Sequence, residues 1–328
     1  MSKPSRYPMP WRKRLWRWFY SHFEFFPILL GCWLIPPLPR SAVLWLANMG
    51  AALAPFFDRR GAQYARANIN YLFPKASPRR KALILRGSYR NIVRVMLDMF
   101  WFDKRHPEKL SRWTSLSPVW HDFLEKSQPK VIVTAHHGNW EMAGHVVVSA
   151  GYPLMSVGKA LGSAHTTEKL NRFRSRFGQE IVLSEGAVRP LLRTLRKGGN
   201  IALLADQHLS AREGGVWTNF MGHRARTAPT PAFFALRVPH SLIGVAYMQA
   251  RPDGSYQCKT PIIIQPMPGE TVERLTQRIV DASSQLIRRF PTQWLYQYKR
   301  WRDIPYNATP EEFPFYARPD KHDLPPAP

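Results

Sequence analysis

Residues 130–141 read Lys-Val-Ile-Val-Thr-Ala-His-His-Gly-Asn-Trp-Glu. The first six residues are rich in β-branched apolar side chains, a pattern typical of a strand that is buried on both faces of a parallel sheet. Gly138 permits a tight turn, and Asn139 is a common residue type at the start of a helix. The stretch therefore predicts a strand, a turn and a helix, with polar side chains where open α/β sheets place their ligands.

The same alternation continues along the chain and predicts the fold class. It is an α/β fold with a mainly parallel central sheet flanked by helices, because short apolar runs alternate with helical patterns. The further strands are expected at 153–157, 180–183, 201–205, 242–247 and 256–264, and the helices at 140–150, 165–177, 187–197, 229–237 and 270–290. We expect this α/β domain to span 61–305, followed by a loosely packed, Pro-rich tail over 306–328.

The first 60 residues predict a helical membrane anchor. Residues 1–22 combine six basic and six aromatic side chains with no acidic one, and two apolar runs follow at 23–38 and 41–57. The first run is shorter than the roughly 20 residues that a full span needs, but its basic and aromatic flank suits an anchor at a cytoplasmic membrane face. The alternative is a buried helical hairpin.

Residues 78–102 predict one long amphipathic helix with a basic stripe. Arg86, Arg90 and Arg94 recur at four-residue spacing, opposite an apolar side that would pack on the core. The stripe is either a solvated face or a surface that lies on anionic headgroups.

The composition excludes several classes of protein. The chain has 328 residues, 45% of them hydrophobic, and a formal net charge of +25, so it can bury a core and should bind an anionic partner. Two cysteines, Cys32 and Cys258, cannot form a disulfide framework. The anionic partner could be nucleic acid, a membrane or an acidic carrier protein. The chain has no helix-turn-helix, RNP or zinc-finger spacing, so we do not expect nucleic acid, which stays the alternative from a different class.

The polar residues after the first strand predict acid–base chemistry. His136 and Glu141 can meet across the turn as a dyad, in which the carboxylate orients the imidazole and stabilises its protonated form. The chain has no G-x-S-x-G elbow and no cysteine in nucleophile-type surroundings, so the nucleophile would be a substrate hydroxyl. Two alternatives remain: a metal site formed by His137, Glu141 and His145, or a purely structural strand end and helix cap.

The motif His136-X4-Glu141 resembles the H-X4-D/E motif of glycerolipid acyltransferases. Its His-His-Gly-Asn-Trp-Glu form looks like the late acyltransferases of lipid A biosynthesis, the lauroyl/myristoyl transferase family of Gram-negative bacteria. His137, His208 and residues 296–298 depart from that family's usual pattern. The later stretches that resemble family motifs, in order and spacing, are 171–178 (NRFRSRFG), 199–207 (GNIALLADQ), 220–227, 291–294 (PTQW) and 299–301 (KRW).

The resemblance implies a role for each site residue. His136 would be the general base and Glu141 its orienting partner, both catalytic. Arg174 would support the site and Asp206 would be a second acid. Together with Gln207 and Asn139, these two would form the substrate-binding set. No metal and no cofactor is implied.

The resemblance also implies the reaction. An acyl chain would move from acyl carrier protein, or from CoA, to a hydroxyl of a lipid A precursor, a phosphorylated glycolipid, at the cytoplasmic face of the bacterial inner membrane. The alternatives are acylation of another membrane lipid, such as an ornithine lipid, a lysophospholipid or a mannosylated phosphoinositide, and a membrane-anchored scaffold without activity.

Overall fold

The computed structural model describes residues 30–160, 164–259, 262–320 and 322. Within these residues the central sheet has six strands in the order β11-β8-β2-β5-β3-β4, and every neighbouring pair is parallel except β11 with β8. The expected mainly parallel sheet is therefore confirmed. The strands are β2 (Lys130–Thr134), β3 (Leu154–Gly158), β4 (Glu180–Leu183), β5 (Asn200–Leu204), β8 (Leu242–Val245) and β11 (Ile262–Ile264).

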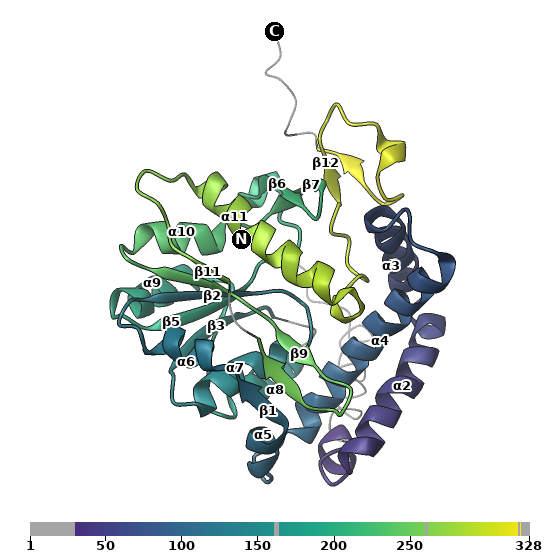
Figure 1. The fold of residues 1–328 in the computed structure, drawn as a ribbon, viewed down its shortest axis with the longest axis vertical. Coiled ribbons are helices and arrows are strands. Elements are labelled where there is room, and N and C mark those ends of the chain that lie inside the picture. Colours follow the sequence, from purple (N-terminus) through teal and green to yellow (C-terminus); the bar gives the residue numbers. More distant parts are fainter. Residues whose placement is uncertain (1–29, 161–163, 260–261, 321, 323–328) are drawn as a thin grey trace, which may run out of the picture.

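Helices cover both faces of this sheet (Figure 1). Val131 and Val133 of β2 pack in one core cluster with side chains of α9, α10 and α11. Ile132, which points to the opposite face, packs in a second cluster with side chains of α6 and α7. The strand is thus buried on both faces, as its β-branched run predicts. The helices are α6 (Pro118–Glu125), α7 (Trp140–Ser149), α8 (Ala164–Ser175), α9 (Val188–Arg196), α10 (Thr230–Arg237) and α11 (Val272–Arg289).

Three further helices, α2 (Arg40–Phe57), α3 (Arg59–Leu72) and α4 (Pro78–Trp101), lie beside the sheet (Figure 1). The helix expected at 78–102 is confirmed, and Ser77 caps it by accepting a hydrogen bond from the amide of Arg80. None of the helices in the described ranges is long and apolar enough to cross a bilayer. The structure therefore does not support a spanning anchor within 30–60, and the basic stretch 1–22 lies outside the described residues.

The remaining strands form small sheets that the sequence patterns did not reveal. The expected strand 256–264 divides into β10 (Tyr256–Cys258), which pairs with β1 (Thr114–Leu116) and β9 (Met248–Ala250), and β11 in the central sheet. Strands β6 (Val216–Phe220) and β7 (His223–Thr227) form an antiparallel pair. The described ranges also contain short elements: α5 (Glu108–Trp113), the 3-10 helices η1 (Ala211–Glu213), η2 (Pro291–Gln293) and η3 (Pro310–Glu312), and the parallel pair β12 (Asp303–Ile304) and β13 (Arg318–Pro319).

The C-terminal segment is packed more tightly than expected. Tyr316 is buried, and its hydroxyl donates a hydrogen bond to Asn68 of α3. Asp320 is also buried and forms an ion pair with Arg226 of β7 at 2.8 Å. The expectation of a loose tail is therefore wrong as far as residue 320, because aromatic and ionic side chains fix this segment to the domain.

Candidate active site

The turn between β2 and α7 requires a glycine and is held on both sides. Gly138 has a φ of 61°, and a Cβ atom there would lie 1.8 Å from the carbonyl oxygen of Met248. The Gly138 amide donates to the carbonyl of Gln293 at 2.9 Å, and the Asn139 amide donates to that of Met248 at 3.0 Å. Any other residue at 138 would force this turn away from its neighbours.

His136 and Asp206 meet at the carboxyl ends of two adjacent parallel strands. His136 follows β2 and Asp206 follows β5. The Nδ1 atom of His136 lies 2.9 Å from Oδ1 of Asp206, and the His136 amide donates to Oδ2 at 2.9 Å. The indole of Trp294 donates a third hydrogen bond to the same carboxylate, at 2.7 Å. The pair therefore occupies the place where this sheet class puts its sites.

The environment of Asp206 favours its anionic form and orients the imidazole. Burial alone would raise the pKa of Asp206, but the charge and hydrogen bonds of His136, with the bond from Trp294, lower it below its usual value. The carboxylate can accept a hydrogen bond from Nδ1–H of His136, and in that neutral tautomer of the imidazole the lone pair is on Nε2. The His136 side chain remains 20% exposed, whereas that of Asp206 is 3% exposed. Of the two side chains, the imidazole is therefore the one that a ligand could reach.

The structure corrects the expected role of Glu141. Its carboxylate does not contact the His136 ring but accepts two hydrogen bonds from Arg174, at 2.8 Å from Nε and 2.6 Å from Nη2. Glu141 lies in the first turn of α7 and Arg174 in the last turn of α8. Because α7 turns the carboxylate toward α8, Asp206 takes the position at Nδ1 that we expected Glu141 to fill.

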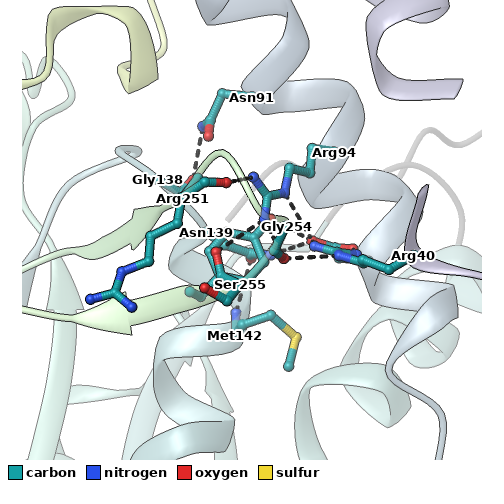
Figure 2. A network of polar contacts seen from close by, with 12 residues as sticks. Arg40, Asn91, Arg94, Gly138, Asn139, Met142, Arg251, Gly254 and Ser255 are labelled. Carbon is teal, nitrogen blue, oxygen red and sulfur yellow. Dashed lines mark hydrogen bonds and ion pairs between the residues drawn. The ribbon is translucent and has the colours of Figure 1, made fainter. Parts of the chain in front are cut away.

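The structure gives Asn139 and Asp206 partners within the protein where substrate contacts were expected. Those of Asp206 are His136 and Trp294. Asn139 is fully buried; its oxygen accepts from the amide of Met142 at 3.1 Å, and its Nδ2 donates to Asp98 at 3.1 Å. It is a helix cap with both ends of its amide engaged. Figure 2 shows the surrounding network, in which Asn91 of α4 donates to the carbonyl of Gly138 at 2.8 Å. Gln207 stays beside the imidazole, with its Nε2 3.5 Å from that of His136.

A mostly apolar cavity of about 70 Å³ lies behind Trp140, and neither His136 nor Asp206 lines it directly. Trp140, whose ring packs edge-on against His136 with centroids 5.1 Å apart, lines it together with Glu141 and Arg174. One nitrogen of Arg174, Nη1, is buried and has no hydrogen-bond partner in the described part of the chain. Deeper walls come from the sheet and α7, including Ile132, Val147, Leu154, Ala202 and Ala246.

The three residues of the alternative metal site have different neighbours. Nε2 of His137 bonds to the carbonyl of Phe290 at 2.9 Å, Glu141 pairs with Arg174, and His145 packs against Phe177. No group of three or more metal-ligating side chains occurs in the described residues. The metal interpretation therefore has no geometric basis here.

Burial of His145 should make the fold sensitive to acid. Burial first, and then the charge of Arg176, lower the pKa of His145 to about 3. Because the pKa of this histidine is lower in the folded than in the unfolded protein, the unfolded protein takes up the proton at a higher pH. The folded protein therefore loses stability as the pH falls below about 6.5, the pKa of histidine in the unfolded chain. Between about pH 7 and pH 5 this residue alone should cost about 2 kcal/mol of unfolding free energy.

Substitution of His145 by Phe should remove that contribution. Urea unfolding of the wild type and of His145→Phe at both pH values measures it, and the variant should lose less stability on acidification. Equal losses in the two proteins would show that His145 carries no such effect.

Comparison with known proteins gives a consistent result. A family model described as bacterial lipid A biosynthesis acyltransferase matches residues 17–303. The phosphatidylinositol mannoside acyltransferase of Mycolicibacterium smegmatis is 22% identical over 277 residues, which cover 83% of this chain and 89% of that protein. The protein of that name from Mycobacterium tuberculosis is 25% identical over 176 residues, 52% of this chain and 54% of its own.

Proposed function

Because the chain belongs to the bacterial lipid A biosynthesis acyltransferase family, we propose that it transfers a fatty acyl chain from a thioester to a hydroxyl of a phosphorylated glycolipid. The observation that carries the mechanism is the hydrogen-bonded pair of His136 and Asp206 beside an apolar cavity. Acyltransferase chemistry follows from the family; the substrates and the base are the proposal.

His136 acts as the general base in this mechanism. Its Nε2 takes the proton of the acceptor hydroxyl while the oxygen attacks the thioester carbonyl, and a tetrahedral oxyanion forms. The carbon–sulfur bond then breaks and the thiol leaves with a proton from the imidazolium. Asp206 stabilises that imidazolium from the Nδ1 side. General-base assistance of this kind typically contributes about 10²–10⁴-fold.

The aliphatic walls of the cavity beside Trp140 suit part of the acyl chain, and its volume of about 70 Å³ accommodates a few methylene groups of that chain. For the oxyanion, the amides of residues 137–139 are all engaged within the protein. Arg174 lines the same cavity, and its buried Nη1 atom has no hydrogen-bond partner among the residues that the structure describes. We assign this guanidinium to the developing negative charge.

Replacement of Glu141 by Gln should lower kcat about tenfold. The amide cannot hold both guanidinium nitrogens as a carboxylate does, so Arg174 would be less well placed. Glu168→Gln is a matched control, because Glu168 pairs with Arg172 on the exposed surface of α8. Steady-state acyl transfer measures both variants. Equal activities of Glu141→Gln and the control would show that the Glu141–Arg174 pair has no part in turnover.

Two acceptor classes have support. The family description names lipid A biosynthesis, whereas the relatives above are phosphatidylinositol mannoside acyltransferases. Both acceptors are phosphorylated glycolipids, and a chain with a net charge of +25 would attract either of them. We place a lipid A precursor first, because the family match covers most of the chain, and a mannosylated phosphoinositide second. Acyl carrier protein is the proposed donor, since acidic carriers suit a basic surface.

Large apolar side chains on α2 support action at a membrane, proposed as the cytoplasmic face of the inner membrane. Trp45, Phe56 and Phe57 are 60%, 73% and 87% exposed. A row of this kind suits a helix that lies against lipid headgroups and acyl chains.

Product analysis by mass spectrometry tests the proposal. Membranes that contain the protein are offered a thioester of acyl carrier protein or of CoA. Each donor is combined with a lipid A precursor, a phosphatidylinositol mannoside or a lysophospholipid. A mass increase of one acyl chain on one acceptor identifies the substrate and the donor. Absence of acylation on every glycolipid offered, with acylation of a lysophospholipid instead, would overturn the proposed acceptor class.

A further inference from the structure

A second cleft, separate from the acyl cavity, lies between α2, α4 and the loop after β9. Its volume is about 370 Å³. Its lining includes Arg90 and Arg94 of α4 and Arg251 after β9, and among the described residues no acidic side chain lines it. We call it the arginine cleft. It plays no part in the mechanism above.

The inner wall of the arginine cleft holds excess positive charge. Arg94 is buried and donates to the carbonyls of Gly254 at 2.6 Å and Arg251 at 3.2 Å, and its Nε has no hydrogen-bond partner in the described ranges. Its nearest carboxylate, Asp98 at 3.8 Å, also accepts from Arg40 of α2. Figure 2 shows Arg40 and Arg94 converging from the two helices. One carboxylate therefore serves two guanidinium groups.

The rim of the cleft carries a guanidinium without a counter-ion. Arg90 has no hydrogen-bond or ion-pair partner among the residues that the structure describes. Partial burial, followed by repulsion from Arg94 and Arg86, lowers the pKa of Arg90. A cation held beside like charges and away from acids gains the most from a bound anion.

We propose that the arginine cleft binds a phosphate ester, either the headgroup phosphate of a membrane lipid or a soluble phosphate. A guanidinium presents paired donors that match phosphate oxygens. Asn48 and Gln249 add amide groups to the same walls, and Oε1 of Gln249 is buried without a hydrogen-bond partner in the described residues. These amides suit the hydroxyl or ester oxygens next to a phosphate.

The position of the cleft favours the lipid source. Leu44 and Asn48 of α2 line the cleft, while Trp45 and Met49, the next residue after each, are exposed. A lipid whose chains meet the apolar face of α2 would bring its headgroup to the cleft. The cleft also shares a wall with the turn of the active site, because Asn91 lines it and bonds to Gly138.

Vesicle binding by single-charge variants tests the site. Vesicles of phosphatidylcholine with phosphatidic acid, and matched vesicles with oleate in its place, are titrated with the wild type, Arg90→Gln and Arg193→Gln. Arg193 is an exposed arginine on α9, so both variants lose the same charge. Arg90→Gln should bind phosphatidic acid vesicles about tenfold more weakly. The affinity of Arg193→Gln for these vesicles should differ from that of the wild type by less than about twofold. The affinity of Arg90→Lys should lie between those of the wild type and Arg90→Gln.

The two sources are separated by competition with glycerol 3-phosphate. If glycerol 3-phosphate displaces the wild type from phosphatidic acid vesicles but has no such effect on Arg90→Gln, a soluble phosphate is sufficient for binding. If Arg90→Gln loses affinity for these vesicles and glycerol 3-phosphate does not compete, the ligand is a lipid headgroup. Either result supports the cleft. The proposed phosphate site would be overturned if Arg90→Gln and Arg193→Gln lost the same affinity for phosphatidic acid vesicles. It would also be overturned if Arg90→Gln lost the same affinity for oleate vesicles as for phosphatidic acid vesicles. Binding alone is measured, so the outcome does not depend on acyl transfer.

Discussion

Substitution of His136 by Ala should reduce kcat for acyl transfer by about 10²–10⁴-fold. The hydroxyl of an acceptor lipid is a weak nucleophile until a base removes its proton. In the His136–Asp206 pair the imidazole is the accessible member, since its side chain is 20% exposed and that of Asp206 is 3% exposed. The KM for the thioester should change little, because the walls of the acyl cavity are untouched. Single-turnover transfer of a labelled acyl group gives the chemical step directly.

A second histidine provides the control for this experiment. His121 is exposed on α6, and His121→Ala should retain wild-type turnover. Thermal unfolding of both variants checks that each is folded. Turnover in His136→Ala within about tenfold of the wild type would exclude the imidazole as the base and would leave the donor and acceptor proposals to be tested separately.

The fold was largely predictable because its central strands carry their own pattern. Strand β2 reads as a continuous β-branched run, and the structure buries Val131, Ile132 and Val133 between two helical layers. Short edge elements were not predictable in the same way. Strands β1, β9 and β13 have two or three residues each, too few to show a period, and they form only through pairing with distant segments.

The sequence pointed to residues that the structure places close together, but not to how they pair. His136, Glu141, Arg174 and Asp206 all lie around one cavity or beside it. Sequence proximity favoured Glu141 as the partner of the imidazole, but the parallel pairing of β2 with β5 brings Asp206 to it from 70 positions away. Strand order is a property of the whole sheet, and no local pattern states it.

Trp294 and Asp98 illustrate contacts that no sequence signal assigns. Trp294 belongs to a stretch that resembles a family motif, yet its partner Asp206 is 88 positions away. Asp98 sits within an amphipathic helix as an ordinary polar residue, and only the fold shows that Arg40, Asn139 and Tyr256 all donate to it. A buried carboxylate with several donors depends on tertiary packing, so its role becomes visible only in three dimensions.

Substitution of Asp206 by Asn should reduce kcat almost as much as loss of the imidazole itself, by about 10²–10⁴-fold. The amide would offer Nδ1 of His136 a donor as readily as an acceptor, so Nε2 would lose its fixed unprotonated form. It would also remove the charge that stabilises the imidazolium, and the acid limb of the rate–pH profile should move to lower pH. A purely structural aspartate would not shift that profile.

The pair formed by His208 and Asp303 gives this substitution a matched control. Nε2 of His208 lies 2.8 Å from Oδ2 of Asp303. Asp303→Asn therefore removes a carboxylate from a histidine without altering the proposed base. Its kcat should stay within about tenfold of the wild type, with an unchanged rate–pH profile. If Asp206→Asn and Asp303→Asn gave the same turnover and the same profile, Asp206 would hold only the fold, and the general base would work without an anionic partner.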